Sequence, residues 1–459
     1  MAAHSVIGQH GLFHDSIRIA LRRRPRQRSG ARGGCEQPAA EDMIRQRASW
    51  CQAGGVTSAG FPASAKNLEA KGGVQRCRGD RVRRACGVGV GAFSLAVKKS
   101  IRIRRCDVAP LDIPLFEPFG ISGGAQSMAN NGLVTLVLDD GSIGYGEAAP
   151  LPAYNGETQA AALSALRAVQ AWIVGFEVSD WRDLGREFRR RSSIRSGAAL
   201  CALEVALIDA LTRREGVPLW SFFGGAGTRL ETDMTVTTGT PDEAARATRA
   251  LRERRIRTIK VKIGGPLGPA HDFARIVAIR EVAPRAPLIL DGNAGLTRAE
   301  AAILVQLLKR AKIKPALLEQ WLPKRDLVGM RLLREESGWL VAADEAVRTV
   351  ADVRRIAEAG AADVVNIKLM KAGLAEAMKI VKVARLAGLE LMVGGNIESI
   401  LTMTVSACFA AGLGGFRFAD LDTPWFLASN PFVGGYAADG GKLSVAHITA
   451  GHGVTPITV

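Results

Sequence analysis

Residues 259–425 repeat one pattern: a short apolar run, a charged residue at its end, and then a longer amphipathic segment. In the first run, period-two alternation puts Ile259, Val261 and Ile263 on one face of a strand and two lysines on the other. Successive charged ends are separated by between 22 residues (398 to 420) and 31 residues (260 to 291), which is room for one strand, one helix and two short loops. The charged ends are Lys260, Lys262, Asp291, Glu319, Asp344, Lys368, Glu398 and Asp420.

Between the runs, apolar residues recur with helical spacing at residues 297–309, 326–336, 349–359 and 374–387. Strands that alternate with helices are typical of a parallel sheet. This many units predict an α/β fold whose sheet closes into a TIM-like barrel. In such barrels functional residues come from the C-terminal ends of the strands, so the charged ends predict a site there.

We expect four parts along the chain: a basic extension (1–98), an α+β capping domain (99–228), the barrel (229–425) and a C-terminal segment (426–459) that packs back on the cap. In the cap, an alternating strand begins near Ile101, a hairpin turns at residues 139–141, and helical patterns cover residues 157–172, 181–191 and 197–214. A glycine-rich loop is expected at residues 118–126, and the first barrel strand near Glu231.

The N-terminal 98 residues hold 17 Lys and Arg against 6 Asp and Glu and show no sustained periodicity. Three interpretations compete. A plastid or mitochondrial transit peptide should be rich in Arg and poor in acids. A disordered tail could bind nucleic acid. Translated sequence ahead of a mis-assigned start codon is the interpretation we favour, because Ile101 has the character of a domain start.

The rest of the composition argues against a nucleic-acid-binding or membrane protein. The formal charge of the chain is +17, but the extension contributes +11 of it and leaves only a mild excess elsewhere. No apolar run approaches the roughly 20 residues that span a bilayer. The seven cysteines do not form a zinc motif. Reduced cysteines fit a cytoplasmic protein.

Three carboxylates, Asp291, Glu319 and Asp344, end three successive runs. A barrel brings such ends together, and three like charges in one place are unfavourable unless a cation neutralises them. Ligands that are all oxygen favour Mg²⁺, with Mn²⁺ as the alternative, over zinc. The alternative for each carboxylate taken alone is a helix cap or a surface acid.

Three lysines, Lys260, Lys262 and Lys368, also lie at strand ends and point inward by alternation. Lysine is rarely buried without a partner, so each could simply form a salt bridge with the carboxylates. A lysine beside another lysine and a divalent cation has a lowered pKa, which makes it a usable base.

The order Lys-x-Lys, Asp-x-Asn, Glu-Gln, Asp-Glu, Asn-x-Lys, Gly-x-x-Glu resembles the muconate-lactonizing subgroup of the enolase superfamily over residues 100–459. The resemblance implies a (β/α)7β barrel with an α+β cap and one Mg²⁺ per subunit, held by the three carboxylates. It also implies that Lys262 and Lys368 face each other across the substrate, with Asn293 and Glu398 among the residues that line the site. Members of this superfamily use such a base on a carbon next to a carboxylate.

The implied chemistry is a two-base proton transfer through an enediolate. A proton next to a carboxylate is weakly acidic, so Mg²⁺ and Lys260 would stabilise the charge that develops on the substrate oxygens. One of Lys262 and Lys368 would remove the proton, and the other would return one to the opposite face. Inversion at that carbon would result.

Asp420 and Asp422 follow the last apolar run as an Asp-x-Asp sequence. This Asp-x-Asp sequence resembles dipeptide epimerases, in which the pair holds the free α-ammonium group; the alternative for Asp422 is a helix or turn cap. In the epimerases of this family that act on Ala-Glu, an arginine of the cap loop pairs with the glutamate side chain. The corresponding loop around Ile121 has no basic residue, so the resemblance implies a neutral or apolar second residue. Trp321 stands where the family usually has proline.

The resemblance therefore predicts an isomerase that acts on a small dipeptide, assembles as a homo-oligomer and binds neither nucleic acid nor membrane. An o-succinylbenzoate synthase, an N-succinylamino acid racemase or a muconate cycloisomerase is the alternative within the superfamily. Nucleic-acid binding by the basic extension is the alternative outside it.

Overall fold

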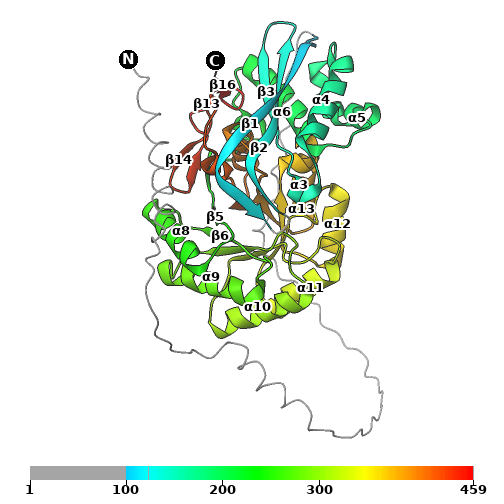
Figure 1. Cartoon of the computed structure of the whole chain (residues 1–459). Helices are drawn as coiled ribbons and strands as arrows, with labels where there is room; N and C mark the ends of the chain where they lie inside the picture. Colours follow the sequence, from blue (N-terminus) through cyan, green and yellow to red (C-terminus); the bar gives the residue numbers. More distant parts are fainter. Residues whose placement is uncertain (1–99, 122–123, 458–459) are drawn as a thin grey trace, which may run out of the picture. The chain divides into compact units, whose positions relative to one another are not determined.

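The computed structural model describes residues 100–121 and 124–457, which all belong to a single compact unit (Figure 1). The basic extension expected at residues 1–98 lies outside the described residues. Among the helices that are described, none is long and apolar enough to cross a membrane.

A parallel sheet of eight strands forms the barrel, in the order β12-β11-β10-β9-β8-β7-β6-β5. The strands are β5 (Met234–Val236), β6 (Ile259–Lys262), β7 (Leu288–Asp291), β8 (Leu317–Glu319), β9 (Val341–Ala343), β10 (Val364–Ile367), β11 (Glu390–Val393) and β12 (Phe416–Ala419). The last strand meets the first through the Asp233 backbone amide, which donates to the carbonyl oxygen of Ala419 at 2.9 Å. The predicted parallel barrel is confirmed.

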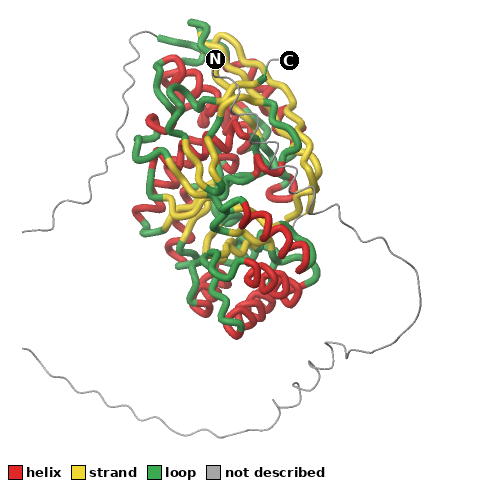
Figure 2. The backbone as a smooth tube through the Cα atoms, turned by 90° about the vertical axis from the view of Figure 1, so that its left-hand side faces the viewer, coloured by secondary structure: helices red, strands yellow, loops and turns green. Residues whose placement is uncertain are grey.

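Each of the first seven strands is followed by a helix on the outside of the sheet (Figure 2). The helices are α8 (Pro241–Glu253), α9 (Gly268–Val282), α10 (Arg298–Arg310), α11 (Leu327–Ser337), α12 (Val350–Ala359), α13 (Leu374–Leu386) and α14 (Ile400–Leu413). Only a short 3-10 turn, η4 (Thr423–Phe426), follows β12, so the (β/α)7β architecture is confirmed.

Threonine caps explain why several of these helices begin where they do. Thr240, Thr297 and Thr349 each accept a hydrogen bond from the backbone amide three residues on, and the acidic side chain of that residue accepts one from the backbone amide of the threonine. Such capping boxes satisfy two of the amides that the first helical turn leaves unpaired. The four helices predicted between residues 297 and 387 are all present.

Alternation along the strands divides the barrel interior into an apolar floor and a polar mouth. The floor is a separate buried cluster that includes Ile289, Leu317 and Ala342. Two residues further along the same chain segments lie Asp291, Glu319 and Asp344, which point into the barrel because side chains two apart share a face. The strands therefore carry the charged residues at their C-terminal ends, above a sealed floor.

The cap is an antiparallel sheet of β1 (Ile103–Ile121), β2 (Gly124–Leu138) and β3 (Ile143–Ala148). It is covered by α4 (Gln159–Ile173), α5 (Trp181–Arg191) and α6 (Gly197–Arg214), which match the predicted helices. β3 lies very close to α6: a Cβ on Gly146 would be 2.0 Å from the carbonyl oxygen of Ala202. Glycine is thus required here by the close approach of strand and helix.

The expectation of a glycine-rich loop at residues 118–126 is corrected by the structure, in which β1 runs to Ile121 and β2 begins at Gly124. β1 and β2 stay paired almost to their tip, with Phe119 opposite Gln126 and Ile121 opposite Gly124. The glycines suggested a loop, but cross-strand hydrogen bonds extend the hairpin, which reaches from the cap towards the barrel (Figure 1). The side chain of Ile121 lies outside the described residues.

The expected start of the barrel near Glu231 is also corrected. Residues Arg229–Glu231 form β4, which pairs with β15 (Lys442–Ser444) of the C-terminal segment, so the first barrel strand is β5. The same segment contributes β14 (Ala437–Asp439), and β13 (Phe432–Gly434) pairs with β16 (Val454–Pro456). His452 lies against α6, where its Nε2 is 3.1 Å from Asp209.

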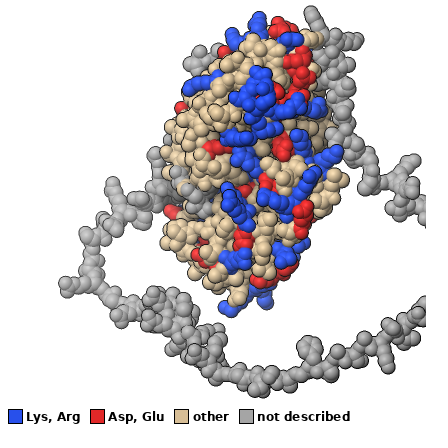
Figure 3. Space-filling model, turned by 90° about the vertical axis from the view of Figure 1, so that its right-hand side faces the viewer, with Lys and Arg blue, Asp and Glu red and all other residues tan. Residues whose placement is uncertain are grey.

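The surface in Figure 3 shows Asp and Glu side chains among the Lys and Arg side chains. On this face the described residues do not form one continuous basic surface, which nucleic-acid binding would require.

Candidate active site

The charged residues predicted from the strand ends gather at one end of the barrel, and all are buried. Lys260 and Lys262 lie in β6, and Asp291 and Glu319 end β7 and β8. The remaining ones come directly after strands: Asp344 after β9, Lys368 after β10, Glu398 between β11 and α14, and Asp420 and Asp422 after β12.

Lys260 is the centre of a buried ion-pair network. Its Nζ lies 2.9 Å from Asp291, 2.9 Å from Glu319 and 2.7 Å from Asp420. These carboxylates come from three different strands, so one ammonium group links opposite sides of the barrel. Burial lowers the pKa of Lys260, but the surrounding carboxylates outweigh it and raise the pKa well above the usual value. Lys260 therefore stays charged.

Lys262 and Lys368 extend this network on either side. Lys262 Nζ lies 2.7 Å from Asp291 and donates to the Asn293 side chain at 3.1 Å. Lys368 Nζ lies 2.9 Å from Asp344 and 4.7 Å from the centre of the Tyr154 ring. Burial lowers the pKa of Lys368, but Asp344 outweighs it and the net direction is upward. Carboxylates are the nearest charges to Lys368, and the lowered pKa expected beside a divalent cation stays a prediction.

The strand order sets the two lysines on opposite walls. β6 and β10 are four strands apart in an eight-stranded sheet, so they face each other across the barrel. β7, β8 and β9, with Asp291, Glu319 and Asp344, form the wall between them. β12 and β5 form the wall opposite β8, and Asp420 and Asp422 lie on that side.

The three predicted metal ligands fit a hard cation in chemistry. Their donor atoms are all oxygen, as Mg²⁺ prefers. Glu319 Oε2 and Asp344 Oδ2 are buried and lack a hydrogen-bond partner within the part of the chain that the structure describes, although each lies 2.9 Å from a lysine nitrogen. Burial, and then Asp291, raise the pKa of Glu319 to about 7. A cation would relieve this repulsion.

Sequence reasoning missed Lys371, which supports Asp344. Its Nζ lies 2.7 Å from the Asp344 side chain and donates to the carbonyl oxygens of Asp344 and Asn366 at 2.7 and 2.8 Å. Tyr154 from the cap also donates to Asp344, at 3.3 Å. The signal for Lys371 was its place three residues after Lys368 in a single helical turn, η3 (Leu369–Lys371).

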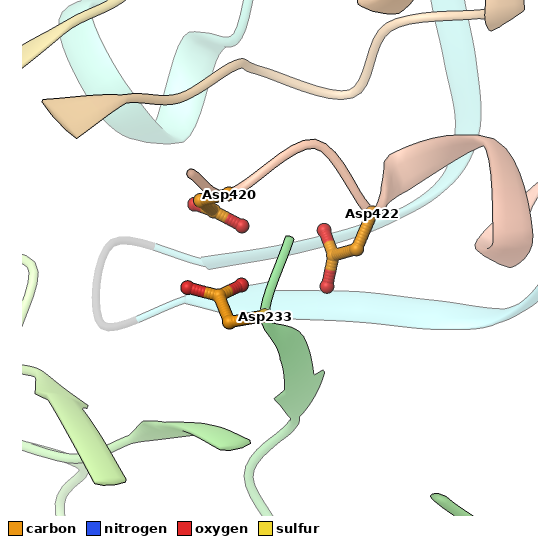
Figure 4. Close-up of side chains that lie close together, drawn as sticks. All are labelled: Asp233, Asp420 and Asp422. Carbon is orange, nitrogen blue, oxygen red and sulfur yellow. The ribbon is translucent and has the colours of Figure 1, made fainter. Parts of the chain in front are cut away.

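Asp233 is a second residue that sequence reasoning missed. It immediately precedes β5, and one oxygen from each of Asp233, Asp420 and Asp422 lies within 4.8 Å of the others. Figure 4 shows the three carboxylates facing one another. Asp422 also accepts a hydrogen bond from the Thr235 backbone amide at 2.8 Å. Burial, and then Asp420, raise the pKa of Asp422 to about 7.

Glu398 and Glu345 add further buried acids around the lysines. Both have one oxygen without a hydrogen-bond partner in residues 100–121 and 124–457. Burial raises the pKa of each to about 8, with a further contribution from Asp344 for Glu345 and from Glu147 for Glu398. Asn293 connects Lys262 to Glu345: its side-chain oxygen accepts a hydrogen bond from Lys262, and its side-chain nitrogen donates one to Glu345 at 3.2 Å.

Trp321, which departs from the family pattern, has a structural role. The indole is 1% exposed, and its Nε1 donates to the carbonyl oxygen of Leu290 at 2.8 Å. The preceding Gln320 accepts from the backbone amides of Asp344 and Ala346. This pair therefore ties β7 to β8 and the β8 end to the residue after β9.

Apolar side chains close the cavity around the two lysines. Phe119 from β1 and Leu151, Tyr154 and Ile397 line it together with both lysines and the aspartates. The centre of the Phe119 ring is 6.0 Å from Lys262 Nζ. In the described part of this lining, the two lysines are the only basic side chains.

Comparison with known proteins agrees with this geometry. Residues 242–457 match the enolase C-terminal domain-like family, and residues 105–224 match the N-terminal domain of mandelate racemase / muconate lactonizing enzyme. An aromatic dipeptide epimerase of Herpetosiphon aurantiacus is 48% identical over 352 residues, which cover 77% of this chain and 98% of that protein.

Solved structures of similar proteins share the fold of this chain. A mandelate racemase/muconate lactonizing enzyme from Roseiflexus sp. is 52% identical, with a TM-score of 0.74 over 78% of this chain and 99% of its own. A dipeptide epimerase from Enterococcus faecalis, complexed with Mg and L-Leu-L-Tyr, is 30% identical, with a TM-score of 0.74 over 77% of this chain and 99% of its own. This chain belongs to the mandelate racemase / muconate lactonizing enzyme family of the enolase superfamily.

Proposed function

We propose that this chain is a Mg²⁺-dependent dipeptide epimerase that inverts the α-carbon of the substrate's C-terminal residue. The observation that carries the proposal is the arrangement of charges around the barrel. Two ammonium groups, on Lys262 and Lys368, lie on opposite walls, with three carboxylates on the wall between them. A carbon held between the lysines has one on each of its faces, which is what inversion by two bases requires.

Asp291, Glu319 and Asp344 would hold the Mg²⁺, or Mn²⁺ as the alternative ion. When bound, the ion would neutralise a substrate carboxylate and so make the neighbouring C–H more acidic. Lys371 and Tyr154 would keep Asp344 in place, since both contact its carboxylate.

The lysines would move the proton. In each direction one of Lys262 and Lys368 starts neutral and removes the α-proton, while the other starts as an ammonium group and donates. Lys260, which has carboxylates on three sides, would stay charged and add positive charge near the substrate carboxylate. Burial of the cavity under Phe119 would exclude water and strengthen these interactions.

A substrate with a carboxylate at one end and an ammonium group at the other suits the two remaining walls. The carboxylate would lie against β7–β9, and the ammonium group against Asp420 and Asp422 beyond β12. A substrate without a free ammonium group would bring no positive charge to these buried acids, which disfavours o-succinylbenzoate synthase and N-succinylamino acid racemase activities.

The second residue of the dipeptide is proposed to be neutral or apolar, with aromatic residues included. Phe119, Leu151, Tyr154 and Ile397 line the cavity, and Phe119 packs edge-on against Phe426 at 5.2 Å. An acidic side chain would meet no cation there among the described residues other than the two lysines. The similarity to an aromatic dipeptide epimerase supports the same preference.

A dipeptide library in D₂O with Mg²⁺ tests the proposal. Deuterium should enter the α-position of the C-terminal residue, as measured by mass spectrometry, and L-Ala-L-Phe should react faster than L-Ala-L-Glu. The Lys262→Ala/Lys368→Ala double variant is the control and should show no uptake. If the wild-type protein exchanges no dipeptide in the library, the proposed function is wrong.

Cytoplasmic location and homo-oligomeric assembly stay predictions. The described cysteines, Cys106, Cys201 and Cys408, are free and buried, which suits a reducing compartment.

A further inference from the structure

Asp233 is a buried acid that the proposed reaction has not yet used. It is 1% exposed, and neither carboxylate oxygen has a hydrogen-bond partner among the described residues. Burial of a polar group without partners is costly, more so for a charge. Desolvation, and then Asp420, raise its pKa well above the usual value. A side chain that destabilises the fold in this way has a reason to be there other than stability.

The side chain points at a shared space rather than into the hydrophobic core. One oxygen from each of Asp233, Asp420 and Asp422 lies within 4.8 Å of the others (Figure 4). Asp422 Oδ1 is also buried and has no hydrogen-bond partner in the described structure, whereas Asp422 Oδ2 accepts a hydrogen bond from the Thr235 backbone amide. Asp233 and Asp422, which lie next to the first and last barrel strands, thus each have a carboxylate oxygen without a hydrogen-bond partner among the described residues, and Asp420 lies beside them.

A primary ammonium group matches this set of acceptors. It has three N–H donors and no acceptor. A nitrogen about 2.8 Å from each of three oxygens allows those oxygens to be about 4.8 Å apart. Lys260 already shows this chemistry at the cluster, because its Nζ lies 2.7 Å from Asp420.

We infer that Asp233 is the third carboxylate of the site for the substrate's α-ammonium group, together with Asp420 and Asp422. The inference rests on the proposed function and extends it: Asp233 makes the site specific for an unsubstituted primary ammonium group. With two carboxylates, one N–H would face no acceptor, and a methyl group could take its place. With three, the first N-methyl group already removes a hydrogen bond and leaves a buried carboxylate unpaired.

The test compares L-Ala-L-Phe with N-methyl-L-Ala-L-Phe in the wild-type protein and in Asp233→Asn and Asp233→Ser. The wild type should prefer the unmethylated substrate by about 10- to 100-fold in kcat/KM, the range expected for one hydrogen bond to a charged group. In both variants kcat/KM for L-Ala-L-Phe should fall by about 10-fold or more, mainly through KM. The preference should shrink to within about 3-fold, because serine makes room for the methyl group and neither side chain carries a charge.

Asp363→Asn is the matched control. Asp363 precedes β10 at the opposite end of the barrel, where it accepts from Arg334 at 2.6 Å and from the Val341 backbone amide at 3.0 Å. Its neutralisation should leave the preference at the wild-type value.

Four results would overturn the inference. In the first, the wild-type kcat/KM values for the two substrates differ by less than about 3-fold, which would mean that the site needs no third acceptor. This result does not depend on whether the variants fold. Equal losses for both substrates in the Asp233 variants would show a structural role only. A Mg²⁺ dissociation constant raised about 10-fold in Asp233→Asn, measured by calorimetry with the preference unchanged, would show a metal site instead. No exchange of any dipeptide by the wild type would overturn the proposed function as well, whereas the first three leave it standing.

Discussion

Replacing Lys260 by methionine should destabilise the protein by about 3 to 5 kcal/mol in the absence of Mg²⁺. The ammonium group lies within 2.9 Å of three carboxylates and is 1% exposed. Removing one partner of a buried ion pair leaves uncompensated charge, and that cost is about 3 to 5 kcal/mol. Asp291, Glu319 and Asp420 would then repel one another, and only Asp291 would keep an ammonium group beside it, that of Lys262.

The loss translates into a measurable shift in Tm. Unfolding entropy is about 2.1 cal/mol/K per residue, so about 360 residues give about 0.75 kcal/mol per degree. The Lys260→Met protein should therefore melt about 4 to 7 °C below the wild type in differential scanning calorimetry with EDTA, at one scan rate. Saturating Mg²⁺ should reduce the difference, because the proposed ion neutralises two of the same carboxylates.

Lys379→Met is the matched control for this measurement. Lys379 pairs with Glu376 at 3.6 Å, but its side chain is 62% exposed. Exposed ion pairs contribute at most about 1 kcal/mol, so its Tm should change by about 1 °C or less. If Lys260→Met melts within that same range of the wild type in EDTA, the buried network does not stabilise the fold as argued.

Two further predictions concern Asp209, which joins α6 to the C-terminal segment, and Tyr154 of the site. Burial raises the pKa of Asp209, but His452 and Arg213 outweigh burial, so the pKa is lowered overall. Asp209 should therefore stabilise the folded protein at pH values above its unfolded pKa of about 3.8. This stabilisation should disappear as the pH falls through the lower pKa of the folded state. Asp209→Asn should thus unfold at lower urea than the wild type at pH 7, and the two curves should converge below about pH 4; a difference that grows on acidification would contradict the sign. Tyr154→Phe removes one hydrogen bond to Asp344, so the Mg²⁺ dissociation constant from calorimetry should rise by about 5-fold, and an unchanged constant would mean that the bond does not orient this carboxylate.

The barrel could be predicted from the sequence because strand-like and helix-like hydrophobic periods alternate regularly along residues 259–425. Strand runs with period two end in charges at regular intervals, and the segments between them carry helical spacing with threonine caps such as Thr297 and Thr349. Convergence of the strand ends then follows from barrel topology alone. The predicted charges are accordingly together in the structure, from Lys260 to Asp422.

The features that the sequence did not predict correctly share one physical cause: each depends on contact between segments that are distant in the sequence. Residues 118–126 contain the glycines of a loop, yet pairing with the partner strand keeps them extended. Glu231 pairs with a strand more than 200 residues later, which no local pattern indicates. The role of Asp233 depends on Asp420, and a single acid outside the repeated pattern gives no sign of its partner; for Lys371, only its spacing from Lys368 indicated a place near Asp344.

The central claim is that one lysine acts on each face of the α-carbon, and isotope exchange in single-lysine variants tests it most directly. Lys262→Ala and Lys368→Ala are each incubated in D₂O with Mg²⁺ and the separate L,L and L,D forms of one reactive dipeptide, and the products are resolved by chiral chromatography and mass spectrometry. We predict that neither variant interconverts the two forms, and that each variant incorporates deuterium into only one of them, with opposite preference. Full epimerisation by either variant, or exchange of both forms by the same variant, would contradict the two-lysine arrangement.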